Sequence, residues 1–437
     1  MTPVTVVGAG FAGCEAAWTL AQNGIPVTLW EMKPQKFSPA HHSPDFAELI
    51  CSNSFKASRL ESAAGLLKAE MERLGSLCVP CAKETAVAAG GALAVDRDRF
   101  SALVTEKIRN HPLITVREGE VTEIPDGNVI IATGPLTSEA LSAAIGELIS
   151  AEYLSFFDAA APIVEASSID MDKVFFAARY GRGDDDYINC PFDKEGYENF
   201  AKELANAESV ELKEFEKRDF KVYEGCMPIE VMARRGADTM RFGPLKPVGL
   251  RDPKTGHRPW AAVQLRRENE AGTLYNIVGF QTNLKFPEQK RVFSMIPGLE
   301  HAVFARYGVM HRNTFMNSPK LLHADFSLRS DPRIFFAGQM TGVEGYMESA
   351  SSGLIAGIAM ARRLRGLPPL ELPETTMLGA LTRYISSSTA EDFQPMGSNM
   401  GILPPLPEKI KGKAERYGAL AARAMQDLEQ TLRDLEA

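Results

Sequence analysis

Two of the six cysteines in this 437-residue chain lie where a thiol could do chemistry. Cys51 begins a polar Cys-Ser-Asn-Ser segment, and Cys226 follows a glycine shortly before a proline, on what should be an exposed irregular loop. The thiolate is the reactive form of cysteine, and a nearby cation or helix N-terminus favours it. A buried, inert role is commoner for a cysteine, but the polar neighbours of Cys51 argue against that role. The sequence therefore predicts two reactive thiols.

Other cysteines lack this setting. Cys78 and Cys81 form a Cys-x-x-Cys without a second pair at zinc-finger spacing, so we expect a structural or incidental role and no metal site. Six cysteines are too few for a disulfide scaffold in a chain of this length.

No stretch approaches 18 uninterrupted apolar residues, and no basic region precedes an N-terminal apolar segment. We therefore expect a cytoplasmic protein with reduced thiols, without a membrane span or a signal peptide.

A glycine-rich motif near the N-terminus, Gly8-Ala9-Gly10-Phe11-Ala12-Gly13, lies between an apolar run and an alanine-rich helical pattern. A second apolar run follows and ends in Glu31. In this order of strand, turn, helix, strand and acid, the glycines permit a tight turn, close approach to a pyrophosphate and close helix packing. The helix N-terminus attracts the pyrophosphate, and the acid accepts hydrogen bonds from the ribose. The pattern predicts a dinucleotide site, because an ordinary glycine-rich turn would leave the flanking elements and the acid unexplained.

Two later apolar strands indicate which dinucleotide is bound. One ends in Ala132-Thr133-Gly134 and the other in Ala337-Gly338-Gln339. With the glycine motif, in this order, they resemble the glutathione-reductase-like flavoprotein fold, which implies FAD rather than NAD. A helix that the segment Met340–Ala350 opens, and that runs to about Leu364, would point its N-terminus at the flavin. In this fold the segment after the second strand passes beside the flavin ring, which implies that Cys51 lies there. The residues expected to bind FAD are Gly8, Ala9, Gly10, Phe11, Ala12, Gly13, Glu31, Thr133, Gly134, Gly338, Gln339, Glu344, Gly345 and Tyr346.

The pattern of elements changes in the middle of the chain. After about residue 165, a charged helical segment and short strands broken by proline and glycine replace the regular α/β pattern. We therefore predict an α/β fold in which a FAD-binding Rossmann domain, residues 1–165 and 310–437, contains an inserted mixed α+β domain, residues 166–309.

The inserted segment is basic, although the whole chain has a net charge of -8. Residues 217–291 contain 15 Lys and Arg against 8 Asp and Glu, a local balance of +7. Such a segment suggests a polyanionic partner at one face, and a solvated surface is the simpler alternative. The cations expected to contact nucleic acid are Arg234, Arg235, Arg241, Lys246, Arg266, Arg267, Lys285 and Arg291.

Several motifs together resemble the TrmFO family of folate- and FAD-dependent tRNA (uracil-5-)-methyltransferases. Besides the opening glycines they are the segments Cys51–Lys56, Gly225–Glu230, Gly279–Leu284 and Phe393–Gly397. The resemblance implies formation of 5-methyluridine at position 54 of the tRNA T-loop, with carbon from 5,10-methylenetetrahydrofolate and electrons from NAD(P)H through FAD. The related GidA (MnmG) proteins, which modify the wobble uridine, share the opening glycines. They usually carry a longer C-terminal helical region, so we expect that this chain is not one of them.

The resemblance marks Cys51 and Cys226 as catalytic. Uracil C5 becomes nucleophilic when a thiolate adds to C6, and a base must later remove the C5 proton. We expect Cys51 to attack and Cys226 to assist proton removal, although the reverse is left open. A small-molecule flavin oxidoreductase would leave Cys226 and the basic segment without a role, and a non-catalytic RNA-binding scaffold would leave both thiols without one. Because no second dinucleotide motif is visible, NAD(P)H is expected to bind transiently near the flavin.

Overall fold

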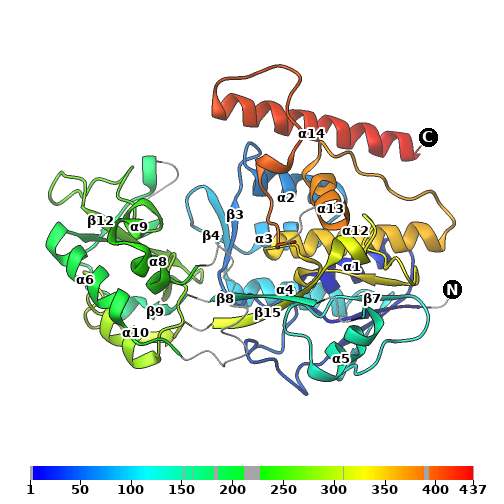
Figure 1. Cartoon of the computed structure of the whole chain (residues 1–437), viewed down its shortest axis with the longest axis horizontal. Coiled ribbons are helices and arrows are strands. Elements are labelled where there is room, and N and C mark those ends of the chain that lie inside the picture. The colour runs from blue at the N-terminus through cyan, green and yellow to red at the C-terminus, as the bar shows by residue number, and fades with distance from the viewer. Residues whose placement is uncertain are drawn as a thin grey trace.

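The computed structural model describes residues 3–150, 153–159, 161–181, 186–210, 227–308, 310–387 and 393–436. They form two bodies that lie side by side (Figure 1). One body contains the N-terminal and C-terminal parts of the chain, and the other contains the middle of the chain, drawn mainly in green. Each body encloses its own cluster of buried apolar side chains, so each has its own hydrophobic core.

A five-stranded parallel sheet is the centre of the first body. In spatial order its strands are β16 (Ile334–Phe336), β7 (Val129–Ile131), β1 (Val4–Val7), β2 (Val27–Glu31) and β6 (Ile114–Glu118). β1 is paired on both sides, with Val6 opposite Leu29 of β2 and Ile130 of β7. Strands of a parallel sheet that is covered on both faces are nearly continuous apolar runs, as β7 and β16 are. The predicted parallel α/β architecture is confirmed.

Helices α1 (Phe11–Gln22) and α12 (Tyr346–Leu364) pack closely against each other beside this sheet (Figure 1). The approach is close because small residues meet at the contact. A Cβ atom on Gly353 would overlap the carbonyl oxygen of Ala12, and one on Gly357 would lie 2.9 Å from Thr19 Cβ. The crossing fixes the N-termini of both helices at the same edge of the sheet.

A six-stranded antiparallel sheet is the centre of the second body. Its strands, in spatial order, are β10 (Phe175–Phe176), β11 (Tyr187–Phe192), β12 (Ala261–Arg267), β13 (Leu274–Ile277), β9 (Ile163–Glu165) and β14 (Phe304–Arg306). Its helices are α6 (Lys194–Asn206), α8 (Ile229–Arg235), α9 (Ala237–Phe242) and α10 (Phe286–Phe293). This combination has the mixed character that the sequence predicts, whereas the domain boundaries at 165/166 and 309/310 stay predictions.

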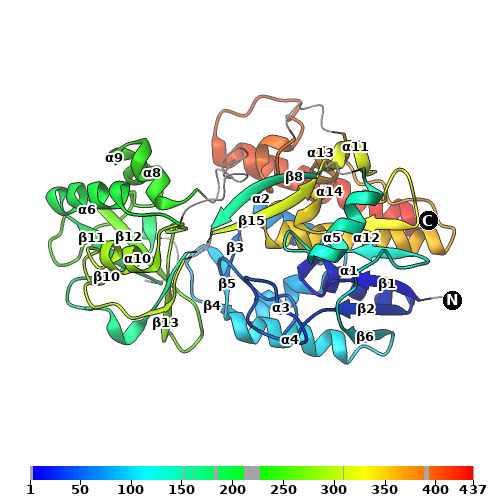
Figure 2. The same ribbon diagram turned by 60° about the horizontal axis from the view of Figure 1, so that its bottom comes forward.

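Two antiparallel strands, β8 (Tyr153–Ala159) and β15 (Met310–Met316), carry the chain into and out of the second body (Figure 2). A small sheet of β3 (Ser54–Ala57), β5 (Ala92–Val95) and β4 (Ala86–Val87) lies on the side of the first body that faces the second (Figures 1 and 2). The segment that holds Cys51 leads directly into β3, so it lies at the junction of the two bodies.

The remaining helices complete the first body and the links. They are α2 (Ala63–Arg73), α3 (Cys78–Glu84), α4 (Arg97–Arg109), α5 (Glu139–Leu148), α11 (Ser318–Leu321), α13 (Met377–Ser387), α14 (Lys413–Glu436), and the single turns η1 (Ala166–Ser168), η2 (Arg179–Gly181), η4 (Gln339–Thr341) and η5 (Met400–Ile402). Helix α2 begins at Ala63, because Ser62 caps it by accepting a hydrogen bond from Gly65 N at 3.1 Å. Among the described residues, no helix combines the length and apolar character needed to cross a bilayer.

Candidate active site

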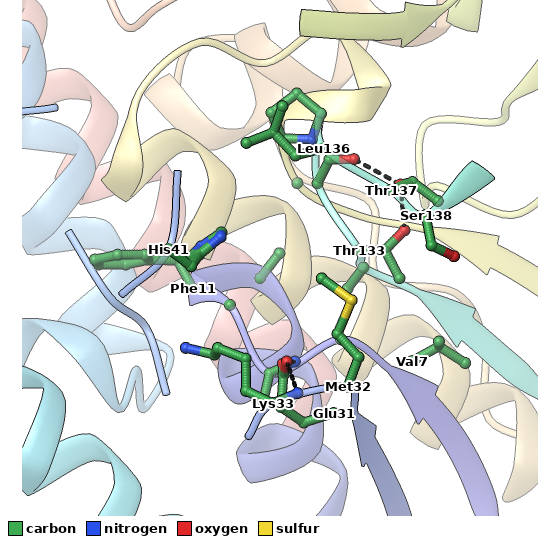
Figure 3. A pocket seen from close by; sticks show the side chains of 18 of the residues that line it. Val7, Phe11, Glu31, Met32, Lys33, His41, Thr133, Leu136, Thr137 and Ser138 are labelled. Carbon is green, nitrogen blue, oxygen red and sulfur yellow. Dashed lines mark hydrogen bonds between the residues drawn. The ribbon is translucent and has the colours of Figure 1, made fainter. Parts of the chain in front are cut away.

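A pocket opens at the carboxyl ends of β1, β2, β7 and β16 (Figure 3). The connection after β1 leads to β2 on one side, whereas the connection after the neighbouring strand β7 leads eventually to β16 on the other side. Open α/β sheets bind ligands at such a point, where the strand order reverses. The empty volume, open solvent at the mouth included, is about 1120 Å³. The predicted FAD residues that line it are Gly8, Ala9, Gly10, Phe11, Ala12, Glu31, Thr133, Gly134, Gly338, Gln339 and Tyr346, whereas Gly13, Glu344 and Gly345 do not.

The glycine turn has the geometry that a pyrophosphate requires. Gly8 has a φ of +96°, and a Cβ atom there would lie 2.7 Å from the Ala132 carbonyl oxygen. A Cβ atom on Gly13 would overlap the Gly8 carbonyl oxygen, so Gly13 lets α1 pack on the turn. Gly10 is the N-cap of α1 and supplies no side-chain cap, and a Cβ atom there would meet nothing within 4 Å. The uncapped N-H groups at the positive end of α1 therefore border open space, which fits a diphosphate.

The carboxylate of Glu31 is held in place at the end of β2. It accepts hydrogen bonds from the backbone N-H groups of Ala9, at 2.8 Å, and Lys33, at 3.0 Å, and the residue is only 7% exposed. A carboxylate has about four acceptor positions, so two remain for ribose hydroxyl groups. Figure 3 shows Glu31 and Lys33 together at one side of the pocket, with Thr133, Thr137 and Ser138 at another.

The wall opposite Glu31 comes from the turns after β7 and β16. Thr133 Oγ1 and Thr137 Oγ1 are 2.6 Å apart, and Thr137 Oγ1 donates to the Gly134 carbonyl at 2.8 Å. The side-chain amide of Gln339 donates a hydrogen bond to Glu344 Oε2 at 2.6 Å. Glu344 thus orients a lining residue and is not itself part of the lining.

Cys51 lies beside the pocket and is tied to it by Tyr346. The Cys51 N-H donates to the Tyr346 hydroxyl oxygen at 2.7 Å, while the Tyr346 ring packs 4.9 Å from the ring of Phe11. Burial, followed by the nearby Cys51 thiol, raises the pKa of Tyr346, so its hydroxyl stays neutral. Cys51 is half-buried and precedes strand β3, because residues 54–57 pair with β5 before α2 begins. Its predicted place beside the cofactor site is consistent with this geometry.

Two guanidinium groups hold the Cys51 carbonyl from opposite bodies. Arg97 Nη2, from α4, donates to it at 3.2 Å, and Arg306 Nη2, from β14, donates at 3.3 Å. Arg97 also forms a two-point ion pair with Glu268, with Nε 2.5 Å from Oε2 and Nη2 3.3 Å from Oε1. Both arginines interact electrostatically with the Cys51 thiol. Positive charge near a thiol favours its thiolate, so the arrangement suits a reactive cysteine.

Arg266, one of the cations expected to contact RNA, has a different place. It is 7% exposed, and its guanidinium donates to Asn53 Oδ1 at 2.9 Å and to Ser52 Oγ at 2.7 Å. Burial lowers its pKa. Asn53 in turn donates to the carbonyls of Val95 and Arg267, both at 2.9 Å. The expectation for Arg266 is therefore corrected: this side chain anchors the turn after Cys51 and is not available to a phosphate.

The other predicted cations differ in how accessible they are. Arg241 lies over the Trp260 ring, with its guanidinium carbon 3.9 Å from the ring centroid, and Arg234 donates to the Ala205 and Ala207 carbonyls. Lys285 forms an ion pair with Glu208, and Arg291 forms ion pairs with Glu203 and Glu288. The exposed members of the set are Arg234, Arg235, Lys285 and Arg291, and the half-buried ones are Arg241, Lys246 and Arg267.

Predictions were also made for Cys226 and for the pair of Cys78 and Cys81. Cys226 lies outside the described residues, so the structure does not test its predicted role. Cys78 and Cys81 are buried in α3, and burial raises the pKa of the Cys81 thiol to about 12 and that of Cys78 as well. Such thiols stay protonated, in keeping with the structural role expected for this pair. Among the described residues, no group of His, Cys, Asp and Glu side chains could hold a metal ion.

Sequence reasoning missed Arg97 and Arg306, which contact Cys51, and Glu268, which pairs with Arg97. They are far apart in the chain and belong to no local motif, so the sequence carries no signal that brings them together. It also missed Lys33 and His41, which line the pocket. Their place in the polar segment after Glu31 was a usable signal, because that segment borders the ribose site.

Comparisons with known proteins show which family the chain belongs to. The chain matches the family model of glucose inhibited division protein A over residues 3–368. It is 57% identical over 433 residues to the methylenetetrahydrofolate-tRNA-(uracil-5-)-methyltransferase TrmFO of Enterococcus faecalis, with 99% of each chain covered. It is 58% identical over 428 residues to the protein of the same name from Heliobacterium modesticaldum, with 98% of this chain and 97% of that one covered.

A solved structure of Aquifex aeolicus GidA has the same fold, with a TM-score of 0.70 and 16% identity over 98% of this chain and 73% of that one. The fold and the pocket define a dinucleotide-binding flavoprotein of the glutathione-reductase-like type. The chain belongs to the glucose inhibited division protein A family and, within it, to the TrmFO group.

Proposed function

We propose that this chain is a methyltransferase that forms 5-methyluridine in tRNA with carbon from 5,10-methylenetetrahydrofolate and electrons carried by FAD. One hydrogen bond carries the proposal, because it links the residue of the thiol to the pocket. The N-H of Cys51 donates to the hydroxyl oxygen of Tyr346, and Tyr346 lines the dinucleotide pocket. The names of the full-length relatives from Enterococcus faecalis and Heliobacterium modesticaldum support the same activity.

The residues of the pocket fit FAD in both charge and shape. The uncapped N-terminus of α1 would bind the pyrophosphate, and Glu31 would accept the ribose hydroxyl groups. The wall formed by Thr133, Gly338 and Tyr346 would border the rest of the cofactor. When bound, FAD supplies the hydride that reduces a methylene carbon to a methyl group.

The thiols supply the chemistry that uracil itself lacks. When a thiolate adds to C6, the electrons of the C5=C6 bond move to C5 and the C4 carbonyl, so C5 can bond to the one-carbon unit. A base then removes the C5 proton while the CH2–N bond to tetrahydrofolate breaks, which leaves a C5=CH2 group. The hydride that bound FAD would supply adds to that CH2 carbon, and the thiolate leaves C6 as the C5=C6 bond forms again. We propose Cys51 as the attacking thiolate and Cys226 as the partner in proton removal. Arg97 and Arg306 fix the Cys51 backbone and bring positive charge to the sulfur.

Three further features belong to the proposal. The target is uridine 54 of the T-loop, the reductant is NAD(P)H bound transiently near the flavin, and the enzyme acts in the cytoplasm. The exposed members of the predicted cation set, Arg234 and Arg235 on α8 among them, are proposed to contact tRNA phosphates.

The test is a methylation assay with purified protein and unmodified tRNA transcript. We expect a yellow protein that forms 5-methyluridine at position 54 when methylenetetrahydrofolate and NADPH are both present, and none when either is left out. A modified wobble uridine in place of that product would favour GidA-like chemistry. NADPH oxidation that needs neither tRNA nor folate, without methylated product, would favour a small-molecule oxidoreductase.

A further inference from the structure

Three aromatic rings form a parallel stack on the second body. The centroids of Phe304 and Tyr307 are 5.0 Å apart with an interplanar angle of 13°, and those of Tyr307 and Phe286 are 4.9 Å apart with an angle of 16°. By contrast, Phe280 and Phe293 in the nearby core meet edge to face at 79°. The Phe286 ring therefore lies at one end of the stack, and Phe286 is 51% exposed.

The stack is rigid because two hydrogen bonds fix its two segments to each other. Phe286 is the first residue of α10, and Tyr307 follows β14. Buried Gln289 of α10 donates to the Gly308 carbonyl at 2.8 Å, and its Oε1 accepts from Gly308 N at 2.8 Å. A binding surface that is fixed in advance loses little conformational entropy when a ligand binds. Figure 1 shows α10 at the lower edge of the second body.

The stack is also joined to the reactive thiol through the backbone. Arg306 precedes Tyr307, and its guanidinium donates to the Cys51 carbonyl at 3.3 Å. Because neighbouring Cα atoms are about 3.8 Å apart, the ring of Tyr307 begins one residue from the side chain that reaches Cys51. Neighbouring residues of one segment therefore contact the Cys51 backbone and form the middle of the stack.

Cations lie on both sides of Phe286 along the chain. Lys285 directly precedes Phe286, and Lys290 and Arg291 follow on α10, all of them exposed. Lys285 pairs with Glu208, and Arg291 pairs with Glu203 and Glu288, so a phosphate would replace these surface carboxylates as the partner of the two cations. Proteins recognise unpaired nucleotides by stacking bases on aromatic rings beside cations that follow the phosphates. A flat exposed ring, flanking cations and the nearby thiol favour a nucleobase over an apolar partner.

We propose that the exposed ring of Phe286 is a stacking platform for an unpaired nucleobase of the RNA substrate. This rests on the proposed function, because it takes tRNA as the substrate. The platform adds affinity through one base and makes no phosphate contact.

The test measures the dissociation constant for unmodified tRNA transcript, without folate or reductant, for wild type and three variants. Phe286→Leu keeps apolar bulk but removes the aromatic face, and Phe286→Trp keeps the face. Phe242→Leu is the matched control, because Phe242 is 77% exposed on α9 of the same body and belongs to no stack of this kind. Flavin absorbance and melting temperature check that each variant folds.

We expect Phe286→Leu to weaken tRNA binding roughly 5- to 150-fold, while Phe286→Trp and Phe242→Leu stay within about threefold of wild type. The slope of log affinity against log salt should not change in Phe286→Leu, because no phosphate contact is lost. An unchanged dissociation constant in Phe286→Leu, or an equal loss in Phe242→Leu, would overturn the platform. A raised KM for methylenetetrahydrofolate with unchanged tRNA binding would also overturn it, since the ring would then bind the pterin. Wild-type protein that binds no tRNA would overturn the proposed function as well, so the two failures are distinguishable.

Discussion

The hydroxyl oxygen of Tyr346 accepts a hydrogen bond of 2.7 Å from the backbone N-H of Cys51. Tyr346 is the first residue of α12, and its ring packs on Phe11 at the start of α1. One side chain thus connects the two helix N-termini at the dinucleotide pocket with the turn that holds the thiol. These contacts hold the pocket wall and the Cys51 backbone next to each other.

Tyr346→Phe should separate cofactor binding from catalysis. The variant keeps the ring contact with Phe11 but leaves the Cys51 N-H without its acceptor, which costs about 1–3 kcal/mol when the group stays buried. We expect a wild-type flavin-to-protein ratio and a tRNA methylation rate lowered roughly 5- to 100-fold. Tyr384→Phe is the control, because it removes a tyrosine hydrogen bond to the Gln394 carbonyl away from the thiol. Equal methylation rates in the two variants would show that the Tyr346 hydroxyl does not position Cys51.

Substitutions at two glycines of the opening motif should affect different properties, cofactor binding at Gly10 and stability at Gly13. A side chain at Gly10 meets open space, so Gly10→Glu should fold but lose FAD, because a carboxylate would lie where the pyrophosphate binds. Gly13→Ala should lower the melting temperature, because its Cβ would overlap the Gly8 carbonyl. Absorbance at 450 nm and thermal unfolding distinguish the two effects. Gly10→Glu protein that retains flavin at the wild-type ratio would overturn the placement of the pyrophosphate.

The parts of the site that were predictable from the sequence are local in the chain. The turn from Gly8 to Gly13 and the acid at Glu31 lie within one strand-helix-strand unit, so their spacing alone predicts their geometry. The charge cluster at Cys51 could not be predicted, because Arg97 and Arg306 meet there only after both bodies have folded. For the same reason Arg266 was misassigned: a charged residue type indicates a surface, and only tertiary structure shows that Asn53 and Ser52 hold it inside.

Glu268→Gln should destabilise the junction of the two bodies. Glu268 is 2% exposed and is the acid that pairs with Arg97, close to Arg266 and Arg306. Removal of one partner of a buried ion pair costs about 3–5 kcal/mol, so we expect a clearly lower melting temperature and reduced methylation. Glu429→Gln, which breaks an exposed pair with Arg73, should leave both nearly unchanged. Similar melting temperatures for the two variants would contradict the structural role given to Glu268.

Glu70 should make stability depend on pH in a defined direction. It is fully buried and accepts hydrogen bonds of 2.8 Å from Met377 N and Leu378 N at the start of α13, and burial raises its pKa to about 7. Because the folded chain holds this proton more tightly than the unfolded chain, the contribution of Glu70 to stability is fully present below about pH 4.5. It is lost as the pH rises toward 7, by up to about 3 kcal/mol.

The measurement is the melting temperature of wild type and Glu70→Gln between pH 5 and pH 8. We expect the advantage of wild type over the variant to shrink as the pH rises, since glutamine has no proton to lose. A difference between the two proteins that is constant across this range would contradict the raised pKa.

The most direct test of the whole account uses tRNA with 5-fluorouridine at the target position. Fluorine replaces the C5 proton that must be removed, so an enzyme that attacks C6 through sulfur stalls as a covalent protein-RNA adduct. Four proteins are each incubated with this RNA, methylenetetrahydrofolate and NADPH: wild type, Cys51→Ala, Cys226→Ala and Cys190→Ala. Cys190→Ala is the control, because the Cys190 thiol is buried in the second body.

We predict an adduct with wild type and with Cys190→Ala, and neither adduct nor methylated product with Cys51→Ala, which should still hold FAD. Cys226→Ala should form the adduct but no product from ordinary tRNA, because the proton-removing partner acts after the attack. An adduct that survives in Cys51→Ala and vanishes in Cys226→Ala would reverse the two roles. Methylated product at the wild-type rate from Cys51→Ala would contradict the claim that the thiol beside the flavin pocket is part of the reaction.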